Sequence, residues 1–289
     1  MGNIYYYNIN YYCNNDCKFC FSSSTGNNKY SVSMATIISE LSTIVRQDDT
    51  VVLNGGEPTI HPEFYDILNA IVEKFSCNVV VYSNGRKIDD ARIAFNNRIR
   101  FVIPIHGDRI THDAITQRDG AFEDTLTTIK NLYDNGYNVN IKFIISQDFL
   151  ESSFSVKEFL LKHKLTDALI IIARLNDTKK SIQNGVRTLD LKMYKKFVTE
   201  IYNTMSITSN LMFLDTPICY LPGFMPSELP EKPLFYFSDY KHRLVKKKYY
   251  KELLIEKNCE GCRYREVCKF LGESYLTTYY EKKWIIKSE

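Results

Sequence analysis

Hydrophobic and polar positions follow two rhythms along the chain, and together these predict alternating strands and helices. Short runs of apolar residues, many of them β-branched or aromatic, predict buried strands. These runs lie at 4–12, 50–53, 78–82, 99–105, 139–145 and 168–173. Between the runs, apolar residues recur every three to four positions, as is typical of amphipathic helices. The predicted helices span 33–46, 62–75, 122–135, 155–163 and 190–204, and Ser33 is a candidate N-cap of the first.

The alternation of strands and helices predicts an α/β fold. Strands that are apolar along most of their length are typical of a parallel sheet covered by helices. Six strand–helix units are too few for a closed eightfold barrel, so we predict a partial (β/α)6 TIM-like barrel over residues 1–206. In barrel-type sheets the chemistry lies on loops that follow the strands. We therefore expect the functional residues at the carboxyl ends of the strands.

The pattern changes after residue 206. Five prolines between residues 215 and 233 predict a loop. A hairpin is predicted through 235–237 and 241–250, and a short cysteine-containing tail follows. Residues 207–289 are therefore expected to form a small C-terminal module of their own.

The 289 residues carry a formal net charge of +3, which demands neither nucleic acid nor a membrane as a partner. The first residues show no basic stretch followed by an apolar one, so we expect no signal peptide. No apolar run in the sequence is long enough to span a bilayer. We therefore expect a cytoplasmic protein, in which thiols stay reduced. Seven of the eight cysteines fall into two groups; Cys77 stands alone before an apolar strand and is expected to be buried.

The first cysteine group is Cys13, Cys17 and Cys20, directly after the first predicted strand. Such tight spacing in a loop lets three thiolates converge on one iron–sulfur cluster. A ferredoxin-like run would carry a fourth cysteine where this chain has Ser24, so one iron of a four-iron cube would lack a protein ligand. An open coordination position distinguishes a reactive metal site from a structural one. A zinc site or a chance grouping of thiols is the alternative.

Three motifs together resemble those of the radical S-adenosylmethionine (radical SAM) enzymes. Cys13-x3-Cys17-Lys18-Phe19-Cys20 is similar to the cysteine signature of that family. Gly55-Gly56-Glu57-Pro58 resembles its glycine-rich turn after the second strand, and Ser83-Asn84-Gly85 is similar to its third-strand motif. The order and spacing of all three motifs fit, and the resemblance covers roughly residues 4–206.

The resemblance implies that Cys13, Cys17 and Cys20 hold a [4Fe-4S] cluster whose fourth iron binds SAM. One electron from this cluster would cleave SAM to a 5′-deoxyadenosyl radical, which abstracts a substrate hydrogen. Glycines would let the backbone approach SAM without a Cβ, and an aromatic ring would pack on the adenine. The implied contacts to SAM are Phe19, Gly55, Gly56, Glu57, Ser83, Asn84 and His106. For His106, contact with substrate or the capping of a turn before Gly107 are alternatives.

The second cysteine group resembles the auxiliary-cluster modules called SPASM or twitch domains. It consists of Cys219 and Cys259-x2-Cys262-x5-Cys268. Four cysteines suffice for one auxiliary [4Fe-4S] cluster, with Cys219 as the fourth ligand. Alternatively, Cys219 is a free thiol that returns a hydrogen atom to a substrate radical. A zinc knuckle is the alternative for the whole module.

Modules of this kind resemble those of peptide-modifying radical SAM enzymes, so the favoured substrate is a ribosomally made peptide or a protein. Epimerisation, cross-linking or oxidation would follow hydrogen abstraction, and flavodoxin or ferredoxin would supply the electron. Only three residues precede the first predicted strand, so we expect no leader-peptide-binding domain there, which weakens the case for a peptide. A small-molecule substrate such as a nucleotide, sugar or cofactor precursor is the second hypothesis. A non-catalytic zinc or iron–sulfur binding protein is the third.

Four further polar residues are weaker candidates. His61 is expected to be structural, at the start of a helix, and His112 and Asp113 are expected to cap and orient a loop. Arg174 ends the sixth predicted strand, where its guanidinium could bind a carboxylate or form a surface ion pair.

Overall fold

The structure is a computed structural model, and its described residues form one sheet with helices. These residues are 2–20, 29–175, 179–186, 189–205, 210–214, 216, 220, 235–238 and 244–247. Seven strands follow one another across the sheet, each parallel to its neighbours. They are β1 (Ile4–Asn8), β2 (Thr50–Asn54), β3 (Asn78–Tyr82), β4 (Ile99–Ile105), β5 (Asn138–Ile145), β6 (Leu169–Arg174) and β7 (Leu211–Leu214).

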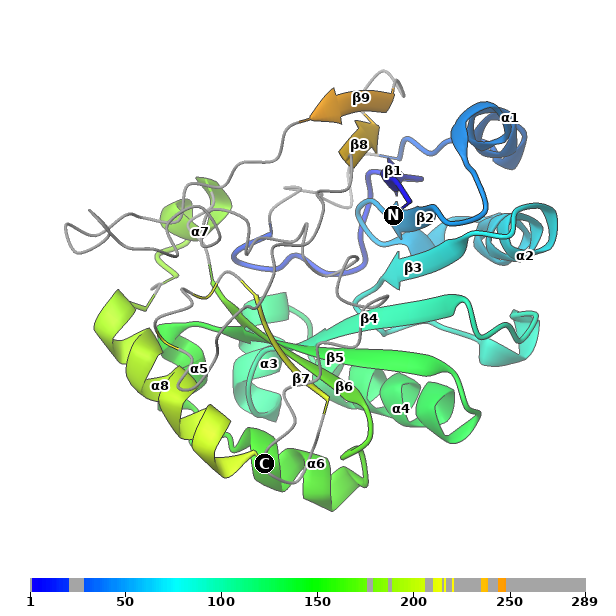
Figure 1. The fold of residues 1–289 in the computed structure, drawn as a ribbon. Coiled ribbons are helices and arrows are strands. Elements are labelled where there is room, and N and C mark those ends of the chain that lie inside the picture. Colours follow the sequence, from blue (N-terminus) through cyan, green and yellow to red (C-terminus); the bar gives the residue numbers. More distant parts are fainter. Residues whose placement is uncertain are drawn as a thin grey trace, which may run out of the picture.

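The sheet is open, because its strand order runs from β7 at one edge to β9 at the other. β8 (Phe235–Ser238) lies parallel to β1, and β9 (Leu244–Lys247) pairs with β8 in antiparallel orientation. The hairpin predicted from the sequence is thus confirmed. Figure 1 shows the hairpin next to β1 in space, although the two are far apart in the sequence. The six predicted strands are all present, and β7 is a strand that the sequence analysis did not predict.

Helices cover one face of the curved sheet (Figure 1). The predicted ones are observed as α1 (Met34–Ile44), α2 (Phe64–Lys74), α4 (Ala121–Asp134), α6 (Val156–His163) and α8 (Leu191–Thr204). The structure adds α3 (Arg109–Thr116), α5 (Gln147–Glu151), α7 (Lys179–Gln183) and the short 3-10 turns η1 (Pro58–Ile60) and η2 (Asp90–Arg92). Side-chain caps begin three of the predicted helices: the oxygens of Ser33, Ser155 and Asp190 each accept a backbone N–H from the first turn.

Both faces of the strands are buried, which explains why their sequences are apolar throughout. Alternate residues such as Tyr7, Phe101 and Phe143 are fully buried beneath the helices. The intervening residues, such as Val52, Val102 and Ile171, form a second apolar cluster on the opposite face. Cys77 is fully buried in the helix-covered core, as the sequence predicts.

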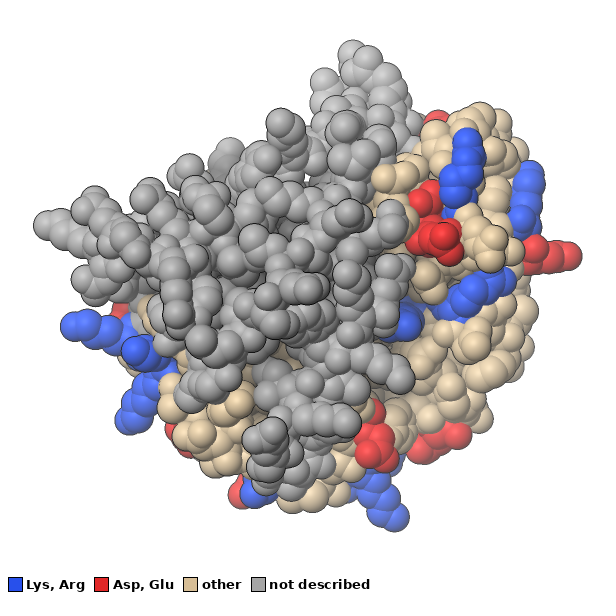
Figure 2. All heavy atoms as spheres, viewed as in Figure 1, with Lys and Arg blue, Asp and Glu red and all other residues tan. Residues whose placement is uncertain are grey.

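Charge on the described surface is mixed in sign. On the face drawn in Figure 2, lysine and arginine side chains alternate with aspartate and glutamate, in keeping with the small net charge. Among the described residues, no helix is long and apolar enough to cross a bilayer.

Arg98 ties the carboxyl end of α2 to the start of β4. Its guanidinium donates to the carbonyl oxygens of Val72 and Phe75 at 2.8 Å each, and to that of Cys77 at 3.3 Å. Carbonyls at a helix end lack partners within the helix, so a donor from outside satisfies them.

We expect Arg98→Ala to lower the free energy of unfolding by about 1–3 kcal/mol, because it leaves partly buried carbonyls without a donor. Urea denaturation of the metal-free protein measures this change. Arg109→Ala is the matched control, since Arg109 is exposed, and should stay within about 0.5 kcal/mol of the parent. Equal stability of both variants would show that the Arg98 bonds contribute nothing net.

Candidate functional site

The cysteine loop, residues 13–20, follows β1 and lies against the carboxyl end of α3. The backbone N–H of Asp16 donates to Thr116 O at 3.0 Å, and that of Lys18 donates to Ile115 O at 2.9 Å. Lys180 of α7 forms an ion pair with Asp16, and the Asn184 amide donates to Lys18 O at 2.8 Å. Elements distant in sequence therefore hold the loop on both sides.

Gly55 and Gly56, which follow β2, pass directly against the chain that leaves β1. Gly55 has a φ of +148°, and a Cβ there would lie 2.4 Å from Asn10 O. A Cβ on Gly56 would lie 2.0 Å from Tyr12 O. The glycines are thus required by the approach of two segments of this chain, which brings the glycine turn beside the cysteine loop.

The strand predicted over residues 4–12 ends earlier, at Asn8, because the chain beyond it bonds to the glycine turn instead. The buried Asn10 side chain accepts from Gly56 N at 3.1 Å and donates to Glu57 O at 2.6 Å. Tyr12 O accepts from Glu57 N at 2.8 Å. Asn10 was not among the predicted site residues; it is one of two asparagines, with Asn8, in an otherwise aromatic and β-branched run.

The carboxylate of Glu57 is buried and joins the ends of β2 and β3. One oxygen accepts from Thr59 N at 3.1 Å, Thr59 Oγ1 at 2.7 Å and Ser83 Oγ at 2.8 Å. The other accepts from Asn84 N at 2.7 Å. Burial raises the pKa of Glu57, and these four donors oppose that rise. The side chain expected to contact SAM is therefore engaged in bonds within the protein.

Ser83 and Asn84 continue this connection toward the thiols. The Ser83 hydroxyl donates to Glu57 and accepts from Gly85 N at 3.0 Å. The Asn84 amide donates to Asn14 Oδ1 at 2.7 Å and lies 3.8 Å from Cys13 Sγ. The second and third motifs thus meet the first at the carboxyl ends of β1, β2 and β3.

Cys13, Cys17 and Cys20 are partly buried thiols in this loop. Burial raises the pKa of Cys13 and of Cys17 to about 12, and the negative charge of the Cys20 thiolate also contributes to the rise. Their side chains do not converge: no group of three or more His, Cys, Asp or Glu among the described residues is arranged to hold a metal ion.

The donor set nevertheless fits an iron–sulfur cluster, since three thiols occupy one loop and Cys13 Sγ already accepts from Asn15 N at 3.4 Å. Hydrogen bonds to sulfur are a feature of such clusters. Because thiols must lose protons to ligate, loading would release protons.

Phe19 and His106 lie together at the carboxyl end of β4. Their rings meet edge to face at a centroid distance of 5.0 Å, and His106 stacks on His112 at the same distance. His106 N donates to His112 Nδ1 at 3.2 Å. Within the described part of the chain, His106 Nδ1 and His112 Nε2 are buried without a hydrogen-bond partner. Burial lowers the pKa of both rings, that of His112 to about 4, so both are neutral at pH 7.

The weaker candidates are mainly structural. His61 bonds to Val32 O at 2.9 Å and accepts from Glu63 N at 3.0 Å, so it fixes the start of α2 as expected. Asp113 caps α4 by accepting from Gly120 N and Phe122 N, which confirms a capping role. His112 belongs to α3 rather than to a loop. Arg174 donates to Leu189 O at 3.3 Å, while its Nε is buried without a partner among the described residues.

The cysteines predicted for the C-terminal module lie outside the described residues. They are Cys219, Cys259, Cys262 and Cys268.

Comparison with protein families identifies the class to which this site belongs. Residues 7–146 match the model of the radical SAM superfamily. That stretch contains the cysteine loop, the glycine turn and the third-strand turn, so this part of the chain is a radical SAM domain.

Individual relatives match parts of the chain. The sporulation killing factor maturation protein SkfB of Bacillus subtilis is 28% identical over 145 residues, which are 49% of this chain and 34% of SkfB. The antilisterial bacteriocin subtilosin biosynthesis protein AlbA of the same organism is 30% identical over 97 residues, 32% of this chain and 21% of AlbA. The matches thus span about a third or less of either curated relative.

Among solved structures, Streptococcus suis SuiB bound to precursor peptide SuiA superposes with a TM-score of 0.66 at 12% identity. The match covers 98% of this chain and 74% of SuiB. Another structure of SuiB is bound to S-adenosylmethionine. At this identity the likeness shows a common fold, the open partial TIM-like barrel that the sequence predicts.

Glu57→Gln should lower the free energy of unfolding by about 1–3 kcal/mol, although the two side chains have nearly the same shape. An amide has only one acceptor oxygen, so its NH2 group would face one of the present donors. Urea denaturation of the metal-free protein measures the loss. Glu63→Gln is the control, because Glu63 accepts from Met34 N through one oxygen only. A Glu57→Gln protein as stable as its parent would mean that the native carboxyl already carries a proton.

His112 should make the protein less stable as the pH falls from about 6.5 toward 4. Its folded pKa of about 4 lies below the ordinary value of 6.5, so the unfolded chain binds a proton that the folded protein does not. Stability from this group is complete above pH 6.5 and is lost as pH falls through 4. Urea denaturation at several pH values should give a shallower dependence for His112→Asn. An unchanged dependence would contradict the assignment.

Proposed function

We propose that this chain is a radical SAM enzyme that abstracts a hydrogen atom from a ribosomally made peptide or a protein. The observation that carries the proposal is the meeting of three motifs at adjacent strand ends. The Asn84 side chain donates to Asn14 in the cysteine loop, and the Glu57 backbone bonds to Asn10 and Tyr12, which lead into that loop. Both Asn84 and Glu57 belong to the matched radical SAM domain. The [4Fe-4S] cluster with bound SAM supplies the electron and the radical chemistry.

Cys13, Cys17 and Cys20 would ligate the cluster. The Asn15 N–H and the Asn84 amide lie within reach of Cys13 Sγ and would favour its thiolate form. The three thiols are partly buried, and shielding a reactive centre from water favours controlled radical chemistry.

SAM would lie against Phe19, His106 and the glycine turn. His106 has a buried nitrogen without a partner among the described residues, as a residue awaiting a ligand would. The carboxylate of Glu57 and the hydroxyl of Ser83 already have hydrogen-bond partners within the protein, so they would act by fixing the turns rather than by contacting SAM. The backbone around Gly55 and Gly56, together with Asn84, would then contact the methionine end of SAM.

Residues 207–289, from which β7, β8 and β9 join the sheet of the partial barrel, would form a twitch-like module. Its auxiliary [4Fe-4S] cluster would be held by Cys219, Cys259, Cys262 and Cys268. The proposal rests on the spacing of these cysteines. The iron content of Cys219→Ala protein separates the two roles open to Cys219, because a hydrogen donor can be removed without loss of iron.

The choice of a peptide substrate rests on the relatives. SkfB and AlbA are named for the maturation of a killing factor and the biosynthesis of a bacteriocin, and SuiB binds precursor peptide SuiA. The bond that is made or broken is left open among epimerisation, cross-linking and oxidation. A flavodoxin or ferredoxin would supply the electron.

Anaerobic reconstitution should load about eight irons per chain, four for each cluster. With dithionite and SAM, the loaded protein should form 5′-deoxyadenosine. The triple variant Cys13→Ala, Cys17→Ala, Cys20→Ala should keep about four irons and form none, because only the auxiliary cluster remains. Zinc without iron in the parent protein, or no 5′-deoxyadenosine from fully loaded protein, would refute the enzyme.

The substrate class is tested with a peptide encoded by a gene beside this one. If its hydrogen is abstracted, deuterium placed in the peptide should appear in 5′-deoxyadenosine, as mass spectrometry would reveal. Deuterium transfer from a small metabolite but not from the peptide would favour the second hypothesis.

A further inference from the structure

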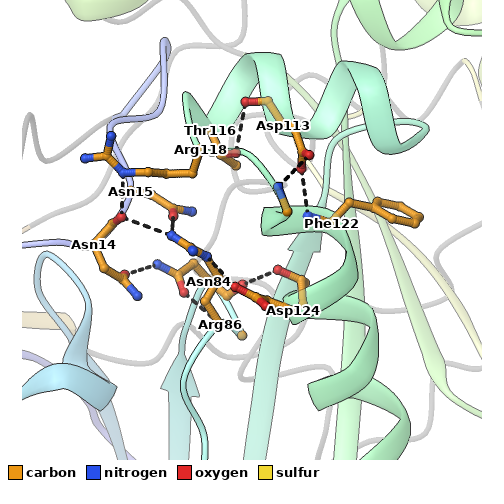
Figure 3. A network of polar contacts seen from close by, with 12 residues as sticks. Asn14, Asn15, Asn84, Arg86, Asp113, Thr116, Arg118, Phe122 and Asp124 are labelled. Carbon is orange, nitrogen blue, oxygen red and sulfur yellow. Dashed lines mark hydrogen bonds and ion pairs between the residues drawn. The ribbon is translucent and has the colours of Figure 1, made fainter.

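Arg86, on the turn after β3, reaches across to the cysteine loop. Its Nη1 donates to Asn14 O at 3.2 Å and to Asn15 Oδ1 at 3.0 Å. These bonds join residues 72 and 71 positions apart in the chain. Figure 3 shows the guanidinium lying between the loop and the first turn of α4.

The other side of the guanidinium is anchored to α4. Arg86 Nε forms an ion pair with Asp124 at 3.1 Å; the Arg86 side chain is 15% exposed and that of Asp124 47%. The same helix turn also bonds to Asn84, because Thr125 Oγ1 donates to Asn84 O at 2.8 Å. Two residues of the turn after β3, Asn84 and Arg86, are therefore fixed to α4.

The helix to which Arg86 is anchored is itself well supported. Asp113 caps its start, and its apolar side is buried against the sheet, with Ile129 and Leu132 fully enclosed. A planar guanidinium that bonds to the helix on one side and to the loop on the other can hold the loop at a fixed position relative to the helix. An ammonium group on a flexible stem cannot do so.

Asn14 is the point at which the loop is held. Its carbonyl oxygen also accepts from Arg118 Nε at 2.9 Å, and its side-chain oxygen accepts from Asn84 (Figure 3). Its Nδ2 is buried without a partner among the described residues. Asn14 directly follows Cys13, so fixing its backbone fixes the first thiol of the set.

We propose that Arg86 is a positioning residue that holds the cysteine loop in place at Asn14 and Asn15, beside the first of the thiols that would ligate the cluster. This role rests on the proposed function, since it concerns the cluster that the thiols would bind. Arg86 would act through Asn14 and Asn15, to which it donates hydrogen bonds.

The test uses the metal-free full-length chain, so it does not depend on cluster loading, SAM or substrate. Iodoacetamide labelling at one pH, resolved by mass spectrometry, gives separate rates for Cys13, Cys17 and Cys77. Cys77 is fully buried in the core and reports global unfolding, whereas Cys13 and Cys17 also report local opening of the loop. The ratio of the Cys13 rate to the Cys77 rate is the measured quantity.

Arg86→Ala should raise this ratio by about tenfold, because it removes hydrogen bonds from a charged donor. Arg98→Ala is the matched control: it removes a carbonyl-bound guanidinium that contacts Cys77 O and not the loop. It should raise the Cys77 rate at least as much as the Cys13 rate, so the ratio should not rise. An unchanged ratio in Arg86→Ala, or an equal rise of the ratio in Arg98→Ala, would overturn the proposal.

Arg86→Lys provides the test should Arg86→Ala fail to fold. Lysine keeps the positive charge but lacks the planar set of N–H donors, so Arg86→Lys should also raise the ratio. Loaded with iron, Arg86→Lys should show an altered electron paramagnetic resonance spectrum of the reduced cluster, whereas Arg109→Ala should not. Loop labelling and 5′-deoxyadenosine formation are separate measurements, so either hypothesis can fail while the other stands.

Discussion

The buried carboxylate of Glu57 is the constraint on which this end of the sheet depends. A carboxylate removed from water needs donors, and those available to Glu57 come from η1 and from the turn after β3. Satisfying it sets how the ends of β2 and β3 lie with respect to each other. Its backbone meanwhile bonds to Asn10 and Tyr12, so the same residue also fixes the chain that leads into the cysteine loop.

The site is accordingly an assembly of loops rather than a set of side chains on one element. The parallel sheet brings the carboxyl ends of β1 to β4 to one edge, as this topology requires. Close backbone contact at Gly55 and Gly56, and polar side chains such as Asn84, then join neighbouring loops. Helices that lie far from the loop in sequence also support it: α3 and α7 contact it directly, and α4 does so through Arg86.

Sequence alone predicted the repeating framework well, because each predicted strand or helix has its own apolar pattern. The limits of β3 and β4 agree residue for residue, and Ser33 caps α1 as expected. Missed elements are short or largely polar: α3 has eight residues, most of them polar, and β7 is apolar throughout but has only four residues. Contacts such as Arg86 to Asn14 were also missed, because nothing local in the chain relates residues so far apart.

The pairing of β8 with β1 has a consequence for the order in which the protein is made. Synthesis produces β1 long before β8, its partner on one side, which begins at Phe235. Until the ribosome has delivered that segment, the nascent chain carries β1 as an open edge, which is a template for association with other chains. The strand that leads into the cysteine loop thus gains its second neighbour only after more than 200 further residues have been synthesised.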